Sequence, residues 1–276
     1  MRVKFLLYIA SLQIVLCAEF SVLTYNIHAL SPLFAGDKPR ERILEILDKS
    51  YGYNCILFQE NWIFSKNNLI EKIDNYTVVV SNKSKYKKLL KGILNKNGSG
   101  LTLLVQNEIS IKDLSEISYD KCSGWLCKAN DCIATKGFQH FTIDVDGIDV
   151  DIYNTHLDAG NSKRDQETRF LQIKQLTEYI ELHSKDRPII LTGDININYL
   201  STKEHSTLKY LVDNLGLSMV EWNNRLDAEY VLDYIFYRGT DAINISLANG
   251  GIDSNLLGTS DHPPIYAQFT LKENSK

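Results

Sequence analysis

The sequence predicts an α/β fold in which two packed β-sheets are covered by helices. Nine short runs rich in β-branched and aromatic residues recur along the 276 residues, and helical patterns fall between them. No repeat, low-complexity tract or Pro/Gly-rich linker divides residues 19–276. We therefore expect one domain with ample chain to bury a core.

Each expected strand is a short apolar run, and several of them end on polar residues, where the rim of a sheet can present side chains. The strands are predicted over residues 20–27, 55–60, 76–81, 101–106, 141–145, 150–157, 188–196, 231–237 and 263–271.

Two helices are predicted from apolar residues at helical spacing. The first covers residues 39–50, with Pro39 in its first turn and Asp37 as its cap, and the second covers 163–183 after Ser162. The apolar faces consist of Ile43, Leu44, Ile46 and Leu47 in the first helix and Phe170, Ile173, Leu176 and Ile180 in the second.

The N-terminus has the composition of an export signal. Residues 1–4 carry two positive charges, residues 5–16 are mostly apolar, and Ala18 precedes the acidic Glu19. We expect residues 1–18 to be a signal peptide and residues 19–276 to be secreted, to an extracellular or periplasmic location. The alternative is an uncleaved membrane anchor, for which the apolar run is short.

Four cysteines remain after residue 18. Outside the cytosol we expect a disulfide among Cys122, Cys127 and Cys132, with the pairing left open. Cys55 lies in an apolar run and is expected to be a buried thiol. The C-x4-C-x4-C spacing lacks the usual hairpin geometry of a zinc site, so a disulfide is favoured over zinc.

Polar side chains of catalytic types follow the predicted strands. Asn26 and His28 end the first strand and Glu60 ends the second. A carboxylate leaving a buried strand costs several kcal/mol unless a cation or a donor compensates it. His156 lies where a strand meets a loop, and a neutral imidazole can face solvent there.

The second half of the chain adds four carboxylate or amide groups and one imidazole. Asp194 and Asn196 lie two residues apart in a predicted strand and are expected to point the same way. Asp233 lies in an otherwise apolar strand, and Asp261 and His262 are adjacent before two prolines. Each group alone also fits a turn or a structural ion pair. Together they form the inventory of metal-assisted phosphodiester cleavage.

The segments TYNI, QE, NTHL, GDIN, LDYIF and SDHPP, in this order, resemble the motifs of the endonuclease/exonuclease/phosphatase superfamily, which includes deoxyribonuclease I and the neutral sphingomyelinases. The resemblance runs from Thr24 to Ile265. It implies a four-layer α/β/β/α sandwich of two packed mixed β-sheets flanked by helices, with residues 19–276 as the catalytic domain. It also implies dependence on Mg²⁺, with Mn²⁺ or Ca²⁺ as other candidate cations.

The resemblance implies a role for each matching residue. Asn26 and Glu60 would lie at the Mg²⁺ site, and Asp261 would be a second metal or hydrogen-bonding group. The implied catalytic roles are these: His262 as general base, Asp233 orienting its ring, Asp194 positioning the nucleophile, Asn196 binding a phosphate oxygen, and His156 stabilising the pentacovalent state or acting as the acid.

One segment favours a lipid substrate. Asp131, Lys136 and Gly137 match a D-C-x-A-x-K-G stretch that is similar to one near the active site of neutral sphingomyelinases. The structural alternative is a disulfide-pinned loop that leads into the strand over 141–145.

The charge and the aromatic content also bear on whether the substrate is a lipid or a nucleic acid. The net charge of −4 disfavours a strongly cationic nucleic-acid binder. Six lysines between Lys83 and Lys96 alternate with leucine and isoleucine, which fits an anionic membrane surface, a nucleic-acid backbone or a solvated loop. Residues 239–260 contain no aromatic residue, whereas bacterial sphingomyelinases resembling this chain expose an aromatic hairpin there.

We therefore predict a secreted, Mg²⁺-dependent phosphodiesterase that hydrolyses sphingomyelin to ceramide and phosphocholine through water activated by histidine. It would act as a monomer in peripheral contact with a membrane lipid surface. The alternative is a deoxyribonuclease I-like endonuclease that cleaves DNA. An inactive scaffold that binds a host surface is a third hypothesis, disfavoured because no expected catalytic position is missing.

Overall fold

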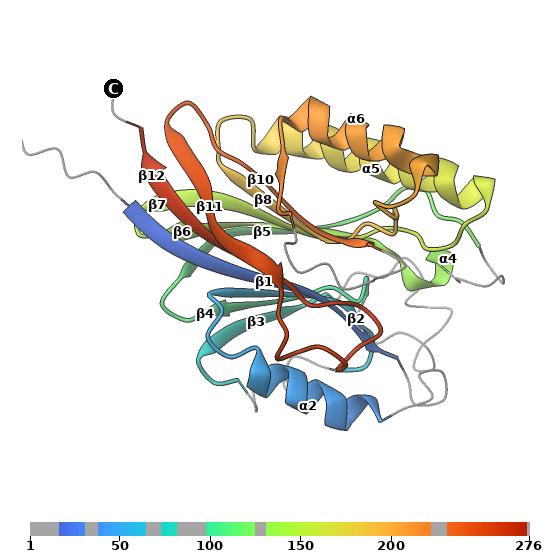
Figure 1. The fold of residues 1–276 in the computed structure, drawn as a ribbon, viewed down its shortest axis with the longest axis horizontal. Coiled ribbons are helices and arrows are strands. Elements are labelled where there is room, and N and C mark those ends of the chain that lie inside the picture. Colours follow the sequence, from blue (N-terminus) through green and yellow to red (C-terminus); the bar gives the residue numbers. More distant parts are fainter. Residues whose placement is uncertain are drawn as a thin grey trace, which may run out of the picture.

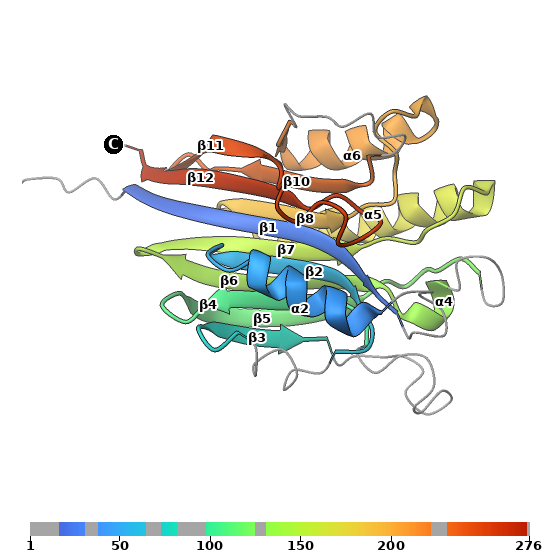
Figure 2. The ribbon, with the colours of Figure 1, turned by 60° about the horizontal axis from the view of Figure 1, so that its bottom comes forward.

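Two six-stranded mixed β-sheets pack against each other in the computed structural model of the protein, and helices cover their outer faces (Figures 1 and 2). The structure describes residues 17–30, 38–64, 73–81, 98–124, 131–221 and 231–274, without the side chains of residues 131 and 133. The predicted four-layer α/β/β/α sandwich is confirmed. The lower helix in Figure 1 covers one sheet, and two helices cover the other.

The first sheet begins and ends the described chain. Its only parallel neighbours are β1 and β2. The helix α2 (Pro39–Lys49) covers its outer face. In spatial order the strands are β11 (Ile243–Ile252), β12 (Ile265–Glu273), β1 (Cys17–Ala29), β2 (Cys55–Asn61), β4 (Thr102–Gln106) and β3 (Tyr76–Val80).

The second sheet comes from the middle of the chain, and its only parallel neighbours are β7 and β8. The helices α5 (Lys163–His183) and α6 (His205–Leu215) cover its outer face, and two short helices, α4 (Asp131–Ala134) and η1 (Thr202–Glu204), lie in loops. The strand order is β5 (Ser110–Ser118), β6 (Gly137–Val145), β7 (Ile148–His156), β8 (Ile189–Asp194), β10 (Asp233–Arg238) and β9 (Ser218–Met219).

Strand alternation assigns the residues of β1 to two cores. Phe20 and Val22 belong to the main core, which includes residues of both sheets, whereas Leu23, Tyr25 and Ile27 pack in a second core with residues of α2. Both faces of β1 are therefore buried, which explains its nearly continuous apolar sequence.

The predicted helices are found, with two exposed residues on the faces expected to be buried. The bounds 163–183 are confirmed, and Ser162 forms a capping box with Asp165. Leu44 and Phe170 were expected to be buried, but they are 37% and 38% exposed because they lie at the borders of their apolar stripes. The expected cap Asp37 lies outside the described residues.

Strands β5, β9 and β11 and helix α6 were not predicted. β5, β9 and β11 are at sheet edges, where one side of the strand has no partner. No residue of β5 is buried, and three of the ten residues of β11 are buried. Edge positions bury little apolar area, so their sequences lack the apolar run on which strand prediction depends.

Several expectations concern residues that the structure does not describe. Residues 1–16 of the expected signal peptide, the lysines from Lys83 to Lys96, and Cys127 lie outside the described residues. Cys17 and Ala18 are the first residues of β1, paired with Lys272 and Leu271. No helix among the described residues is long and apolar enough to cross a membrane.

Candidate active site

The predicted catalytic side chains converge at one end of the two sheets. Parallel pairing brings together the carboxyl ends of β1 and β2 in one sheet and of β7 and β8 in the other. In antiparallel β10, Asp233 lies directly opposite Asp194. Because the two sheets pack face to face, four strand ends and the start of a fifth meet at this rim.

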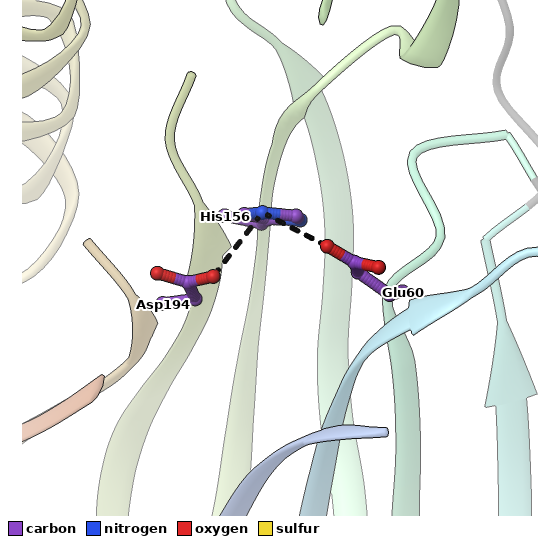
Figure 3. A group of neighbouring side chains, drawn as sticks. All are labelled: Glu60, His156 and Asp194. Carbon is purple, nitrogen blue, oxygen red and sulfur yellow. Dashed lines mark ion pairs between the residues drawn. The ribbon is translucent and has the colours of Figure 1, made fainter. Parts of the chain in front are cut away.

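Glu60, His156 and Asp194 form the centre of the cluster (Figure 3). The imidazole Nε2 of His156 lies 3.4 Å from Asp194 Oδ2 and 3.9 Å from Glu60 Oε1. One ligand atom from each residue lies within 4.8 Å of the other two. These three residues, from β2, β7 and β8, can therefore face one small ligand together.

Asn26 links the carboxylates of the cluster. Its Nδ2 donates to Glu60 Oε1 at 3.2 Å and to Asp194 Oδ2 at 3.0 Å. Its Oδ1 accepts the backbone N–H of His28 at 3.1 Å. In this orientation Asn26 presents amide hydrogens to the cluster and holds the carboxylates in place.

His262 and Asp233 form a second, overlapping group with Asp194. The Nδ1 of His262 lies 2.8 Å from Asp233 Oδ2, and its Nε2 lies 3.9 Å from Asp194 Oδ2. Burial disfavours the charged ring, but the two carboxylates outweigh it and raise the pKa of His262 to about 11. The ring is thus protonated at neutral pH when no cation is present.

The opposite protonation state holds for His156. Burial and the ammonium group of Lys136 both lower the pKa of His156 well below its usual value. Lys136 Nζ lies 2.9 Å from His156 Nε2 and donates to the carbonyl of Leu157 at 2.7 Å. His156 is therefore neutral, and Lys136 supplies a buried positive charge beside it.

The two central carboxylates also differ. Burial raises the pKa of Asp194 to about 7, with Asp233 adding to the effect. Burial opposes ionisation of Glu60 as well, but the hydrogen bond with His28 and the positive charge of Lys136 outweigh it and hold its pKa well below the usual range. Glu60 is therefore the permanently charged carboxylate of the cluster.

The remaining predicted residues lie at the periphery. Asn196 follows β8, which ends at Asp194, and has a left-handed φ of 53°, so the expectation that the strand continues to Asn196 is wrong. Its backbone N–H bonds Asp194 Oδ1, and its Nδ2 donates to Leu157. The side chain of Asp261 is more than half exposed, and its Oδ2 lies 3.5 Å from His28 Nδ1.

A cavity of about 440 Å³ lies beside Asn196. Asn161, Gln166, Asn198, Lys203 and Glu204 are among its lining residues.

His28 was noted in the sequence beside Asn26 but was given no role. Its Nδ1 lies 3.4 Å from Glu60 Oε2 and 3.5 Å from Asp261 Oδ2. The only signal for His28 in the sequence is its position two residues after Asn26. The left-handed backbone conformation that directs its ring toward Glu60 cannot be predicted from the sequence.

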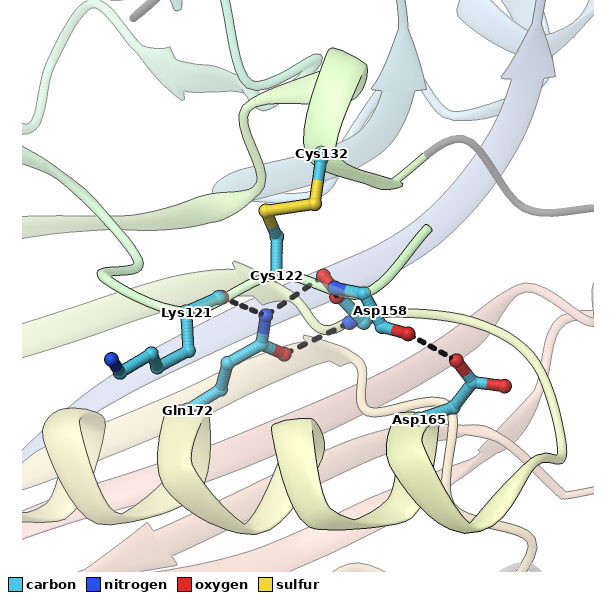
Figure 4. Close-up of a disulfide and its surroundings, with 7 residues drawn as sticks. Lys121, Cys122, Cys132, Asp158, Asp165 and Gln172 are labelled. Carbon is cyan, nitrogen blue, oxygen red and sulfur yellow. Dashed lines mark hydrogen bonds between the residues drawn. A yellow bond between two sulfur atoms is a disulfide. The ribbon is translucent and has the colours of Figure 1, made fainter. Parts of the chain in front are cut away.

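The segment from Asp131 to Gly137 is supported by the disulfide Cys122–Cys132, which joins α4 to the chain that follows β5 (Figure 4). The carbonyl of Lys136 accepts the N–H of Tyr119 at 3.0 Å. Gly137 is required because a Cβ there would lie 2.1 Å from the carbonyl oxygen of Ile117. Asp131 lies in α4, and its side chain is outside the described residues.

Gln172 of α5 connects the same segment to the loop after His156 (Figure 4). Its Nε2 donates to the carbonyl of Lys121 at 2.9 Å and to Asp158 Oδ1 at 2.7 Å. The N–H of Ser123 also donates to Asp158. The disulfide segment, α5 and the end of β7 are thus held as one unit around Lys136.

The donor set fits a hard divalent cation. Mg²⁺ binds through one or two carboxylates and retains waters, and Glu60 and Asp194 supply carboxylate oxygens at the rim. The imidazole of His156 is a poorer ligand for Mg²⁺ and is already in contact with Lys136. Glu60 and Asp194 are the residues that could hold the cation.

Comparison with known proteins agrees with this architecture. The model of the endonuclease/exonuclease/phosphatase family 2 matches residues 23–223. A sphingomyelinase of Mycobacterium bovis is 26% identical over 170 residues, which cover 54% of this chain and 34% of that protein. The matched segment thus spans about a third of the length of the curated relatives.

Solved structures share the fold across almost the whole chain. Sphingomyelinase C from Streptomyces griseocarneus has a TM-score of 0.68 and 18% identity, covering 91% of this chain and 99% of that one. A beta toxin variant from Staphylococcus aureus with bound magnesium ions has a TM-score of 0.62 and 16% identity, covering 94% and 100%.

Proposed function

The chain belongs to the endonuclease/exonuclease/phosphatase family, and from that premise we propose that it is a secreted, Mg²⁺-dependent phosphodiesterase that hydrolyses sphingomyelin to ceramide and phosphocholine. The observation that carries the proposal is the contact between Lys136 and His156, which brings the segment resembling neutral sphingomyelinases into the carboxylate cluster. Residues 1–18 would be the signal peptide and residues 19–276 the catalytic domain.

The proposed cation site uses Glu60 and Asp194. When bound there, a divalent cation would supply positive charge that stabilises the phosphoryl oxygens and offsets the carboxylates that keep His262 protonated. Glu60 is suited to this role because it is ionised and is held by Asn26 and His156.

Proton transfer from water is assigned to His262. Its Nδ1–H donates to Asp233, which leaves Nε2 as the atom that takes the proton as the water oxygen bonds to phosphorus. Asp194 lies 3.9 Å from this Nε2 and would position the attacking water. The bond from phosphorus to the ceramide oxygen then breaks, that oxygen takes a proton from solvent water, and His262 releases its proton to solvent.

His156 and Lys136 would act on the phosphoryl group. His156 Nε2 accepts from the ammonium group of Lys136 and would hold that group where it stabilises the negative charge that develops in the pentacovalent state. Asn196 would bind a further phosphate oxygen, beside the cavity that could receive the polar head group.

We also propose that the protein is exported and acts at a lipid surface. The disulfide Cys122–Cys132 supports an oxidising location, and the sphingomyelinase relatives support a lipid phosphodiester over DNA. Contact with the membrane would be peripheral, and the protein would act as a monomer.

The substrate is tested by incubating the protein with Mg²⁺ and either sphingomyelin vesicles or plasmid DNA. We expect release of phosphocholine and an intact plasmid. His262→Ala should lower the rate by about 10²- to 10⁴-fold, while the control His183→Ala, at the exposed end of α5, should retain it. Nicked plasmid with intact vesicles would replace the lipid proposal by a deoxyribonuclease I-like activity.

A further inference from the structure

His28 is the one imidazole at the rim to which the proposed reaction gives no role. We propose that His28 is a positioning residue that holds Glu60 in the orientation needed to bind the divalent cation. The inference rests on the proposed function, because it takes Glu60 as a cation ligand.

The two oxygens of Glu60 have different partners. Oε1 faces the interior of the cluster, where it accepts from Asn26 and lies near His156. Oε2 faces outward, 3.4 Å from His28 Nδ1. His28 therefore holds the outer oxygen and leaves the inner oxygen directed toward Asp194.

The backbone is distorted to make this contact. His28 and Glu60 both adopt left-handed conformations, with φ of 44° and 57°. Strict alternation along β2 would put Glu60 on the same face as Ile56 and Phe58, which pack in the second core with residues of α2. The left-handed residue breaks this alternation and turns the carboxylate toward the rim.

The register between the two strands shifts at the same place. β1 and β2 pair regularly up to Asn26, and the pairing resumes at Ala29 with an irregularity between. Left-handed φ costs roughly 1–2 kcal/mol for a residue other than glycine. Strained residues persist where surrounding contacts hold them, and they cluster at functional sites.

Arg42 of α2 supplies those surrounding contacts. Its Nη2 donates to the carbonyl of His28 at 2.9 Å, and its Nη1 donates to the carbonyl of Thr259 at 3.2 Å. Thr259 belongs to the loop that carries Asp261, the second carboxylate beside His28 Nδ1. The imidazole is thus fixed by its own backbone and by two carboxylates beside Nδ1.

The expected effect of losing His28 follows from the general contribution of residues that orient a metal ligand. Residues that orient a metal ligand typically contribute 10–100-fold to metal affinity. The ring itself is a poor ligand for Mg²⁺, which prefers oxygen, so His28 acts through Glu60. Its loss should weaken cation binding far more than it slows the reaction at saturating cation.

Two substitutions distinguish the effect of the His28 side chain from the effect of its strained backbone. His28→Gly tolerates φ of 44° and removes the ring, whereas His28→Asn also tolerates this φ and keeps a donor near the position of Nδ1. Mg²⁺ affinity is measured by titration calorimetry on chelator-treated protein, and thermal unfolding is measured alongside. If His28→Gly does not fold, His28→Ala replaces it.

We expect His28→Gly to weaken Mg²⁺ binding by about 10–100-fold and His28→Asn to remain near the wild-type affinity. Equal Mg²⁺ affinity in wild type and His28→Gly, or equal losses in both variants, would overturn the inference. Glu60→Gln is the separate check on the proposed function. If this variant leaves Mg²⁺ affinity unchanged, Glu60 is no cation ligand, and the proposed cation site is wrong independently of His28.

Discussion

His262 shows how neighbouring charges set the protonation of a single side chain. Asp233 contacts one ring nitrogen at 2.8 Å, and Asp194 lies 3.9 Å from the other. These two carboxylates keep the ring positive in the cation-free protein in spite of its burial. In the proposed reaction, His262 could act as a base only where a cation offsets this charge, which would couple cation binding to catalysis.

Asp233→Asn should lower the pKa of His262 from about 11 toward its ordinary value of 6.5 in chelator-treated protein, because one of the two raising carboxylates is removed. The folded-state pKa lies above the unfolded value, so protonation of His262 stabilises the fold fully below about pH 6.5. That contribution is lost as the pH rises through the folded-state pKa, which lies lower in the variant.

The imidazole titration is followed by NMR of the His262 ring. Asp213→Asn, on the exposed face of α6, is the matched control and should leave the titration unchanged. An unaltered His262 pKa in Asp233→Asn would contradict the assignment of Asp233 as its partner.

At the scale of elements, one buried carboxylate ties the end of α5 to the second sheet. Asp151 of β7 accepts from Thr142 of β6 at 2.6 Å and from Ser184, the C-cap of α5, at 2.5 Å. Arg187 also donates to it at 2.6 Å. A charge with three donors can remain buried, so this contact fixes where α5 ends against the sheet.

Asp151→Asn should lower the free energy of unfolding by about 2 kcal/mol at neutral pH. Burial raises the pKa of Asp151, but its contacts with His140, Ser184 and other donors outweigh this and lower it to about 2. The stabilisation is thus complete above about pH 4 and is lost as the pH falls toward 2.

Urea unfolding at several pH values checks this expectation. The wild type should lose stability between about pH 4 and pH 2, and Asp151→Asn should lose less over the same interval. Parallel pH profiles for the two proteins would show that Asp151 has no role in this loss.

At the scale of the whole molecule, the site exists because two sheets meet. Asn26 and Glu60 belong to the first sheet, and His156, Asp194 and Asp233 belong to the second. The hydrogen bond from Asn26 to Asp194 joins residues 168 positions apart. Neither sheet alone contains a complete cluster, so the site depends on their packing.

The disulfide contributes to the same long-range order. Cys122 and Cys132 are 10 residues apart, and closing a loop of this size stabilises a fold by about 3 kcal/mol. We expect the double variant Cys122→Ser/Cys132→Ser to unfold at lower urea. Its activity should also fall, because the segment that supports Lys136 is no longer pinned.

Reduction provides the control for this prediction. Dithiothreitol should lower the urea midpoint of the wild type and leave that of the double variant unchanged. Equal urea midpoints of the oxidised wild type and the double variant would show that the disulfide does not support the fold.

Much of the fold could be predicted from local pattern. The strands that are buried on both faces are nearly continuous apolar runs, and the amphipathic α5 has a periodic sequence whose start is marked by Ser162. The edge strands β5 and β11 could not be found this way, because few of their residues are buried and neither strand has an apolar run. Leu44 was misplaced because periodicity alone does not show where a buried stripe ends.

The sequence by itself determined which side chains are available at the strand ends, because residue type and the order of the motifs are local properties. Only the tertiary structure decided how these groups act. It brought the ends of two sheets together, turned His28 and Glu60 toward each other through left-handed backbone, and placed Lys136 beside His156. Protonation states depend on distances between buried charges, and such distances exist only once the chain has folded.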